Sequence, residues 1–187
     1  MKYYLPVALT TLRLLLGPCA LGCALLGANG WWYLPILLAG TLSDIFDGIL
    51  ARRWGVATPG LRRYDSTADV IYHLFIVAAA WIACRPVIER TWSWIAAILA
   101  SEALVIAVGF ARFGRYPAAH SWLAKLFGLC LLGGLIALLV FHAGDWSVIT
   151  LAIIGLLSNA ETIGIHLLAQ EPPVDVKSIF AVRRAGK

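Results

Sequence analysis

Residues 31–52 read WWYLPILLAGTLSDIFDGILAR, a stretch with no charged side chain except Asp44 and Asp47 near its end and the closing Arg52. A helix of about 20 residues, rising about 1.5 Å per residue, crosses the hydrocarbon core of a bilayer. A charged side chain within that core costs at least about 2.5 kcal/mol, and such residues usually serve a function. We therefore predict a transmembrane helix with a functional site at its polar end.

The rest of the chain is as apolar as this stretch. Of its 187 residues, 61% are hydrophobic and 13% are charged, whereas a soluble domain has about half and about a quarter. Because a globule of this size cannot bury so much apolar surface, a large soluble core is the less favoured alternative. We predict an all-α integral membrane bundle of six transmembrane helices over residues 1–170 and a basic cytoplasmic tail over residues 171–187. The six predicted spans are Tyr4–Leu26, Trp31–Arg52, Thr67–Cys84, Trp92–Phe110, Leu123–Phe141 and Trp146–Leu168.

The basic residues predict the orientation of these spans. Twelve of the 15 Lys and Arg residues lie at one set of helix ends and in the tail, while only Arg85 and Arg90 lie at the opposite ends. Because Lys and Arg are enriched in cytoplasmic loops, both termini are predicted to be cytoplasmic, as an even number of spans requires. The net charge of +5 then reflects membrane orientation and no binding to nucleic acid.

Four aspartates gather around the loop between the second and third spans. Asp44 and Asp47 are three residues apart and share a helix face, and Asp65 and Asp69, four apart, do the same if the third helix extends back to Asp65. The two helices are consecutive and antiparallel, so the pairs can face each other. Four carboxylates in a low dielectric repel one another and need cations. Because hard oxygen ligands suit Mg²⁺, Mn²⁺ or Ca²⁺, the pattern predicts a site for two divalent cations.

The alternative is a set of interfacial carboxylates that form ion pairs with the arginines of the loop, which are Arg52, Arg53, Arg62 and Arg63. Two face-sharing pairs on adjacent helices favour the metal site over this alternative. Gly48 directly follows Asp47 and lets a ligand approach the carboxylates closely. Arg52 can bind a phosphate through its bidentate guanidinium. Together these residues fit a metal-chelated diphosphate.

The same residues resemble the signature of the CDP-alcohol phosphotransferase family, which is D-x-x-D-G-x-x-A-R, a short loop, and then G-x-x-x-D-x-x-x-D. This chain has Asp44-Ile45-Phe46-Asp47-Gly48-Ile49-Leu50-Ala51-Arg52 and, after the loop, Asp65-Ser66-Thr67-Ala68-Asp69. Seven residue types match, and the distance from the arginine to the third aspartate is that of the family. The six spans also resemble this family, and Thr10-Thr11-Leu12-Arg13 is similar to its common T-x-x-R opening.

Two positions depart from the pattern of the family. The usual loop glycine stands four residues before the third aspartate, where this chain has Leu61, and Gly60 comes one position early. We expect either a turn rebuilt around Pro59-Gly60 or a nucleotide that meets a different backbone there. In the first span, Val7 replaces an Asn that is often seen in relatives.

The resemblance implies a role for each matching residue. Asp44, Asp47 and Asp65 would hold two divalent cations, Mg²⁺ or Mn²⁺, and Asp69 would touch a metal and act as the general base. Three small or basic residues would line the CDP site: Gly48, Ala51 and Arg52. The implied reaction transfers a phosphatidyl-type group from a CDP-linked lipid, expected to be CDP-diacylglycerol, to a small polar alcohol with release of CMP. The family implies a homodimer, and we expect a multi-pass protein of a bacterial inner membrane whose active site faces the cytoplasm.

The acceptor alcohol is the part of the reaction that the sequence determines least. Relatives use glycerol 3-phosphate, inositol phosphate, inositol, serine, choline or another lipid. A phosphorylated acceptor would bind to cations, and three lie on the same predicted side as the motif: Arg112, Arg115 and Lys125. An equal alternative is that these residues only follow the positive-inside bias. We prefer glycerol 3-phosphate or an inositol phosphate and keep the non-phosphorylated acceptors as the alternative.

Three other functions share some of these features. A membrane prenyltransferase also uses Asp-rich motifs and Mg²⁺, but such enzymes resemble longer chains with an Asn before the first motif, where this chain has Ser43. A cation transporter would carry ionisable groups through its depth, whereas these aspartates lie at one membrane face. An inactive family member is compatible with the shifted Gly60, although the complete set of aspartates argues against it. His73, one turn after Asp69, is expected to be a satisfied interior histidine, with a metal or substrate contact as the alternative.

Overall fold

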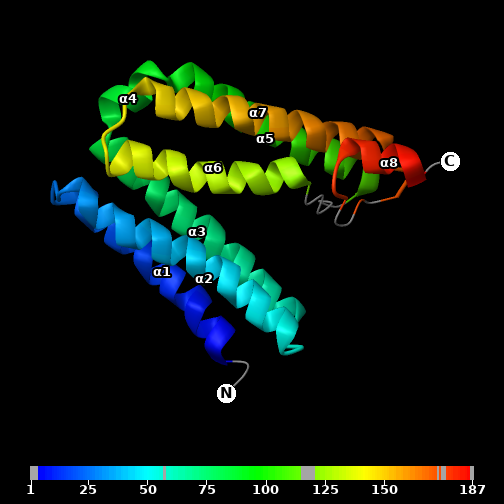
Figure 1. The fold of residues 1–187 in the computed structure, drawn as a ribbon, viewed down its shortest axis with the longest axis horizontal. Coiled ribbons are helices and arrows are strands. Elements are labelled where there is room, and N and C mark those ends of the chain that lie inside the picture. The colour runs from blue at the N-terminus through cyan, green and yellow to red at the C-terminus, as the bar shows by residue number, and fades with distance from the viewer. Residues whose placement is uncertain (1–3, 57, 115–120, 172, 174–175, 186–187) are drawn as a thin grey trace. The chain divides into compact units, whose positions relative to one another are not determined.

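A computed structural model describes residues 4–56, 58–114, 121–171, 173 and 176–185, and every regular element within them is helical (Figure 1). Six of these helices are long and apolar enough to cross a membrane. The predicted all-α fold with six membrane-spanning helices is therefore confirmed. In chain order the elements are α1 (Tyr4–Leu25), the 3₁₀ turn η1 (Gly30–Trp32), α2 (Tyr33–Arg53), α3 (Pro59–Ala83), α4 (Arg85–Arg90), α5 (Trp92–Phe113), α6 (Trp122–Leu139), α7 (Asp145–Leu168) and α8 (Ile179–Ala185).

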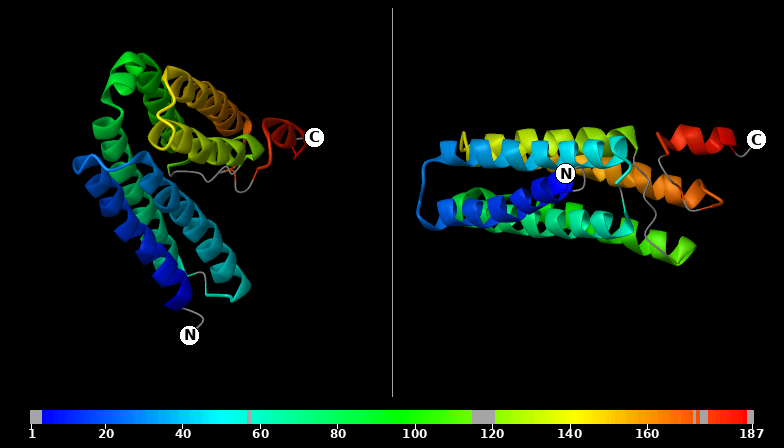
Figure 2. Two further views of the ribbon diagram at one scale, coloured as in Figure 1. Left: turned by 60° about the vertical axis from the view of Figure 1, so that its left-hand side comes forward. Right: turned by 90° about the horizontal axis from the view of Figure 1, so that it is seen from below.

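The described residues fall into two compact units. The first unit contains the chain up to Pro86 together with Leu135–Ala143, and the second contains Val87–Gly134 and the chain from Gly144 onward. In the first unit, α1 packs against both α2 and α3, and Figures 1 and 2 show the three long helices side by side. Every predicted site aspartate belongs to α2 or α3, so the first unit contains all four.

The turn between α2 and α3 determines how the two halves of the aspartate motif meet. Gly55 ends α2 in the left-handed region with φ of +68°. The N–H of Val56 donates to the Ala51 carbonyl (3.0 Å) and that of Gly55 to the Arg52 carbonyl (3.2 Å). These two bonds form a Schellman motif, which satisfies carbonyls at the helix end and reverses the chain.

The helix α3 begins at Pro59, eight residues before the start of the predicted third span at Thr67. The side chain of Thr58 accepts a hydrogen bond from the Leu61 N–H (3.2 Å) and caps the helix. Proline suits the first helical position, because its missing N–H would have no partner there. The expected turn around Pro59-Gly60 is therefore wrong: these residues start α3, and the turn lies at Gly55. The early start places Asp65 on the same helix as Asp69.

In the second unit, α5 packs against α7, and α8 lies on α7. Gly155 of α7 is buried where the side chains of Ile98 and Phe127 converge, and a Cβ there would clash with Ile98 and lie 3.0 Å from Phe127. The guanidinium of Arg90 donates to both carboxylate oxygens of Asp145 at 2.7–3.1 Å. The short helices α4 and α8 were not expected from the sequence.

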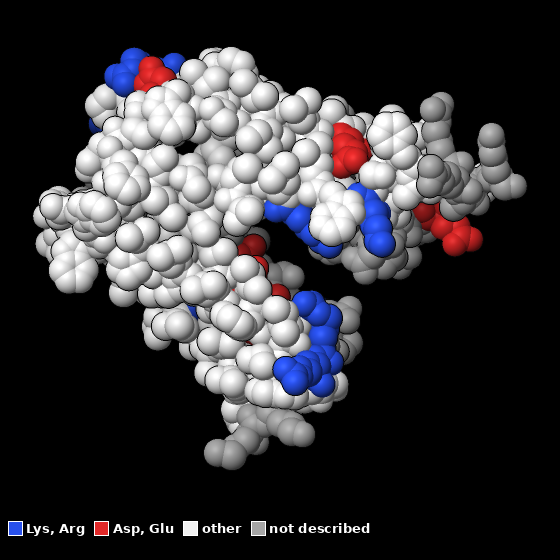
Figure 3. Space-filling model, in the orientation of Figure 1, with Lys and Arg blue, Asp and Glu red and all other residues white. Residues whose placement is uncertain are grey.

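The outer surface of the helices suits lipid more than water. Large apolar side chains such as Leu15 (62% exposed) and Leu74 (64% exposed) point away from the protein. Figure 3 shows that few charged side chains interrupt the visible surface. In a membrane such side chains need no further burial, because the lipid is the apolar phase.

The contact between Gly40 and Tyr72 tests the packing of α2 on α3. A Cβ at Gly40 would clash with the hydroxyl and ring of Tyr72, which is 4% exposed. We expect Gly40→Ala to lower the free energy of unfolding by about 1–3 kcal/mol through overpacking, measured as a lower thermal midpoint in detergent. Gly22→Ala is the matched control, because no atom beyond the adjacent backbone of its own helix lies within 4 Å of a Cβ there. Equal midpoints for the two variants would contradict the packing described here.

Candidate active site

One face of α2 carries the first half of the motif. Asp44, Asp47, Gly48 and Ala51 follow each other at intervals of three, one and three residues, and Arg52 lies next to them. Such intervals place side chains along a single stripe of a helix. On α3, Asp65 and Asp69 are four positions apart and share a face in the same way.

Arg13 of α1 lies among the four aspartates. Its Nη1 atom is 2.6 Å from Asp44 Oδ1 and 3.1 Å from Asp69 Oδ1. Its Nη2 atom is 2.7 Å from Asp47 Oδ2 and 2.9 Å from Asp65 Oδ1. One guanidinium thus contacts carboxylates from two helices, and it uses one oxygen of each. Among the described side chains, the ion pairs of these aspartates go to Arg13 and His73, which disfavours pairing with Arg52, Arg53 and Arg63.

Two threonines of α1 add further contacts to the same face. The Thr10 hydroxyl lies 3.0 Å from Asp47 Oδ2 and 3.1 Å from the Pro6 carbonyl. The Thr11 hydroxyl donates to the Val7 carbonyl (2.8 Å) and accepts from the Tyr64 hydroxyl (2.8 Å). Thr10 therefore joins α1 to α2, and Thr11 joins α1 to α3.

The cluster has a buried side and an open side. Arg13 is 1% exposed and Asp47 is 4% exposed, whereas Asp44, Asp65 and Asp69 are 49%, 37% and 44% exposed. The Arg13 guanidinium therefore occupies the protein side of the cluster. The three half-exposed carboxylates keep surface that a ligand can reach.

The oxygens of three aspartates meet the first requirement of a cation site. Asp44, Asp47 and Asp65 each offer a carboxylate oxygen, and these oxygens lie within 4.8 Å of one another. A set of hard oxygen donors without nitrogen or sulfur suits Mg²⁺ or Mn²⁺. Asp69 is not part of this group. Its Oδ1 atom lies 3.3 Å from His73 Nδ1, which also lies 2.9 Å from the Asp69 carbonyl oxygen.

The residues predicted to bind CDP differ in their accessibility. Arg52 is exposed and Gly48 is half-buried, and a Cβ at Gly48 would lie 3.3 Å from Arg52 Nη1. The missing side chain thus leaves room for the guanidinium to fold back along the helix. Ala51 is 7% exposed, so a ligand reaches it less readily than the other two.

The residues predicted to bind the acceptor belong to the second unit. Arg112 Nη2 donates to the Ala169 carbonyl (3.1 Å), and the Lys125 ammonium lies 5.1 Å from the centre of the Trp122 ring. Arg115 lies outside the residues that the structure describes. Their role in acceptor binding stays a prediction.

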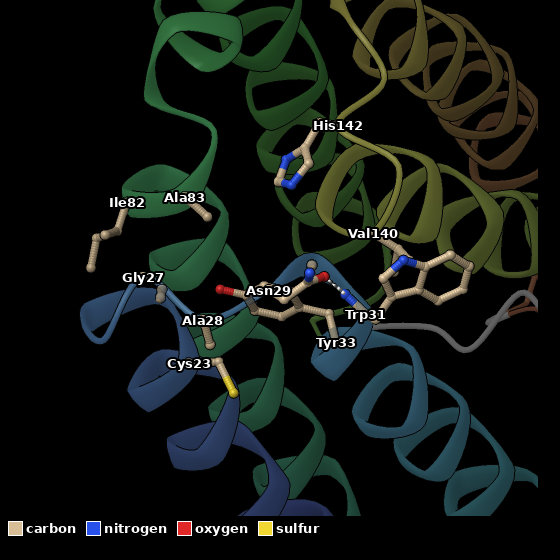
Figure 4. A pocket seen from close by; sticks show the side chains of 12 residues that line it. Cys23, Gly27, Ala28, Asn29, Trp31, Tyr33, Ile82, Ala83, Val140 and His142 are labelled. Atoms are coloured by element: carbon tan, nitrogen blue, oxygen red, sulfur yellow. Dashed lines mark hydrogen bonds between the residues drawn. The ribbon is translucent and has the colours of Figure 1, made fainter.

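Figure 4 shows a cavity in the first unit whose lining includes none of the four aspartates. Its volume is about 580 Å³, and its lining includes Cys23, Asn29, Trp31, Tyr33 and His142. Tyr33 and Asp44 are eleven residues apart on α2, which is about 16 Å along a helix. The lining contains no acidic or basic side chain apart from His142, so the cavity does not suit a charged diphosphate.

Arg13 and Thr10 were not among the site residues predicted from the sequence. Both belong to the T-x-x-R segment of the first span, and their spacing of three residues places them on one face of α1. The signal that identifies Arg13 is electrostatic. A lone arginine inside an apolar span needs a buried anionic partner, and this chain has four aspartates that need a cation.

Comparison with known proteins identifies the family of this chain. The family model described as CDP-alcohol phosphatidyltransferase matches residues 3–159. A segment of 91 residues is 33% identical to a cardiolipin synthase (CMP-forming) of Streptomyces coelicolor, and it covers 48% of this chain and 40% of that relative. No solved structure matches the chain. Because the family model spans most of the chain and includes the whole aspartate motif, this multi-pass membrane protein belongs to the CDP-alcohol phosphatidyltransferase family.

Proposed function

We propose that this protein transfers a phosphatidyl group from CDP-diacylglycerol to an alcohol and releases CMP. The observation that carries the proposal is the convergence of four carboxylates from α2 and α3, three of them half-exposed, at one end of the membrane helices. Family membership supports the donor class. The CMP-forming relative supports CMP as the leaving group.

The site residues divide into two groups in this proposal. Asp44, Asp47 and Asp65 hold the divalent cations, because their oxygens lie close together. Bound cations would neutralise the diphosphate and stabilise the departing CMP. Arg52, exposed beside Gly48, binds a phosphate oxygen through its guanidinium. Ala51 lies on the same face of α2 but is buried, so its role is to leave space for the nucleotide with a small side chain.

Asp69 serves as the general base. Its carboxylate lies outside the group of three metal-binding oxygens and contacts Arg13 and His73. It takes the proton from the acceptor hydroxyl as the oxygen attacks the lipid-proximal phosphorus. The new phosphorus–oxygen bond forms the phosphodiester, and the bond between this phosphorus and the CMP oxygen breaks. His73 keeps the Asp69 side chain in place through its contact with both the carboxylate and the carbonyl of that residue.

The membrane setting suits this reaction. The aspartates stand near the ends of α2 and α3 that meet at the Gly55 turn, so acyl chains remain in lipid while the nucleotide stays in water. We propose that this end faces the cytoplasm, because the basic residues gather on the same predicted side. A bacterial inner membrane and a homodimer complete the proposal, and both rest on the family. Prenyl transfer and cation transport fit less well, because the matched family has a different chemistry.

Three classes of acceptor alcohol fit the proposal. Arg112 and Lys125 favour a phosphorylated alcohol such as glycerol 3-phosphate or an inositol phosphate. The name of the Streptomyces relative adds a lipid alcohol as the second candidate, because cardiolipin is itself a phospholipid. Inositol, serine and choline form the non-phosphorylated alternative.

The role of Asp69 can be tested with purified protein, CDP-diacylglycerol and a panel of these acceptors. With Mg²⁺ or Mn²⁺ we expect acceptor-dependent CMP, and none after a chelator removes the metal. Asp69→Asn should lower the rate of CMP release about 10²-fold or more, since general base catalysis contributes that much. Glu171→Gln is the control, because this carboxylate is exposed and is not one of the proposed site residues. CMP release at the wild-type rate from Asp69→Asn would exclude Asp69 as the base.

The acceptor class can be tested by removing the proposed cations. If the acceptor is phosphorylated, Arg112→Gln and Lys125→Gln should raise KM for it about 5-fold or more, while KM for CDP-diacylglycerol and kcat change little. The neutral acceptors provide the comparison, since KM for them should not depend on these cations. If KM is unchanged for every phosphorylated acceptor, Arg112 and Lys125 do not bind the acceptor and only follow the positive-inside bias.

A further inference from the structure

Arg13 stands out as a fully charged side chain that the chemistry above does not use. It is 1% exposed and contacts all four aspartates at 2.6–3.1 Å. Its Nε atom is buried and has no hydrogen-bond partner among the described residues. The guanidinium therefore makes these contacts through its two Nη atoms, and they go to the four carboxylates.

The charges around Arg13 do not balance. Four aspartates and one arginine give the cluster a formal charge of −3, since the nearby residue His73 is neutral unless protonated. Without Arg13 the charge would be −4 on the same four side chains. Like charges at such short range repel one another, most strongly on the buried side of the cluster. Arg13 thus reduces the repulsion among the four carboxylates, as a bound divalent cation would also do.

We propose that Arg13 is a resident counter-cation that competes electrostatically with the divalent cations for the aspartate cluster. Its positive charge holds the four carboxylates together from the buried side and keeps α1 on α2 and α3. The same charge repels any cation bound at the oxygens of Asp44, Asp47 and Asp65 and so sets an upper limit on the affinity of the site. Arg13 is a positioning residue in this role. The inference rests on the cation site of the proposed function.

Two substitutions separate the effect of the charge of Arg13 from the effect of its shape. Arg13→Met removes the charge and keeps a long side chain, whereas Arg13→Lys keeps the charge and loses the fork of two Nη atoms. Mn²⁺ binding is measured by electron paramagnetic resonance of the free ion at constant ionic strength, and thermal midpoints are measured with and without Mn²⁺. Arg53→Met is the matched control, because Arg53 is an exposed arginine at the end of α2 and has no role in the proposed site.

We expect Arg13→Met to bind Mn²⁺ at least about tenfold more tightly than the wild type, because the repelling charge beside the ion is gone. For Arg13→Lys and Arg53→Met we expect Mn²⁺ affinities within about 3-fold of that of the wild type. The Arg13→Met protein should also have a lower midpoint without Mn²⁺ and a larger rise on Mn²⁺ addition. If this variant unfolds without metal, it is purified with Mn²⁺, and release into a chelator should be slower than from the wild type.

Several results would overturn the inference. Weaker or unchanged Mn²⁺ binding in Arg13→Met, or faster release, would mean that Arg13 only organises the ligands and does not compete with the ion. Equal changes in Arg13→Met and Arg13→Lys would assign the effect to shape and not to charge. A wild-type protein that binds no Mn²⁺ would overturn both this inference and the proposed cation site. A wild-type protein that binds Mn²⁺ but releases no CMP would contradict only the proposed reaction. Mn²⁺ binding by the two Arg13 variants would still test the role of Arg13.

Discussion

The guanidinium of Arg13 and the four carboxylates around it form the contact on which the first unit depends. An arginine buried in a membrane span is costly without a partner, and so is a group of carboxylates without a cation. Each offsets the cost of the other at distances of 2.6–3.1 Å. Because the partners come from α2 and α3, the same contact that stabilises the charges also joins three helices.

This contact determines the register of α1. A shift of α1 by one residue would rotate Arg13 by about 100° and move it away from the aspartates. Thr10, one turn earlier, contacts Asp47, and Thr11 contacts Tyr64, so two hydrogen bonds support the same register. Apolar packing alone specifies register weakly between membrane helices, since lipid tails are as apolar as the helix surfaces. Polar contacts inside the bundle therefore carry much of the specificity.

The division of the cluster into a buried and an open side relates the fold to the chemistry. Arg13 and Asp47 are covered by protein, while Asp44, Asp65 and Asp69 keep between a third and a half of their side-chain surface. A phosphoryl transfer catalyst needs fixed charges that a diphosphate can still reach. The buried half supplies rigidity and the open half supplies access. The neutral cavity near Tyr33 has neither property, which separates it from the reaction.

Most of the fold could be predicted from residue patterns, because long apolar runs have few alternatives to a membrane helix. The spacing of Asp44, Asp47, Asp65 and Asp69 was enough to bring four carboxylates to one place, and the same motif identified the family. The helix α3 starts before the predicted span at Thr67, because the cap at Thr58 and the proline after it begin the helix within the polar segment. The partner of the aspartates was not predicted. Arg13 is more than 30 residues from Asp44 in the chain, and residues so far apart meet only through helix packing, which spacing along the sequence does not encode.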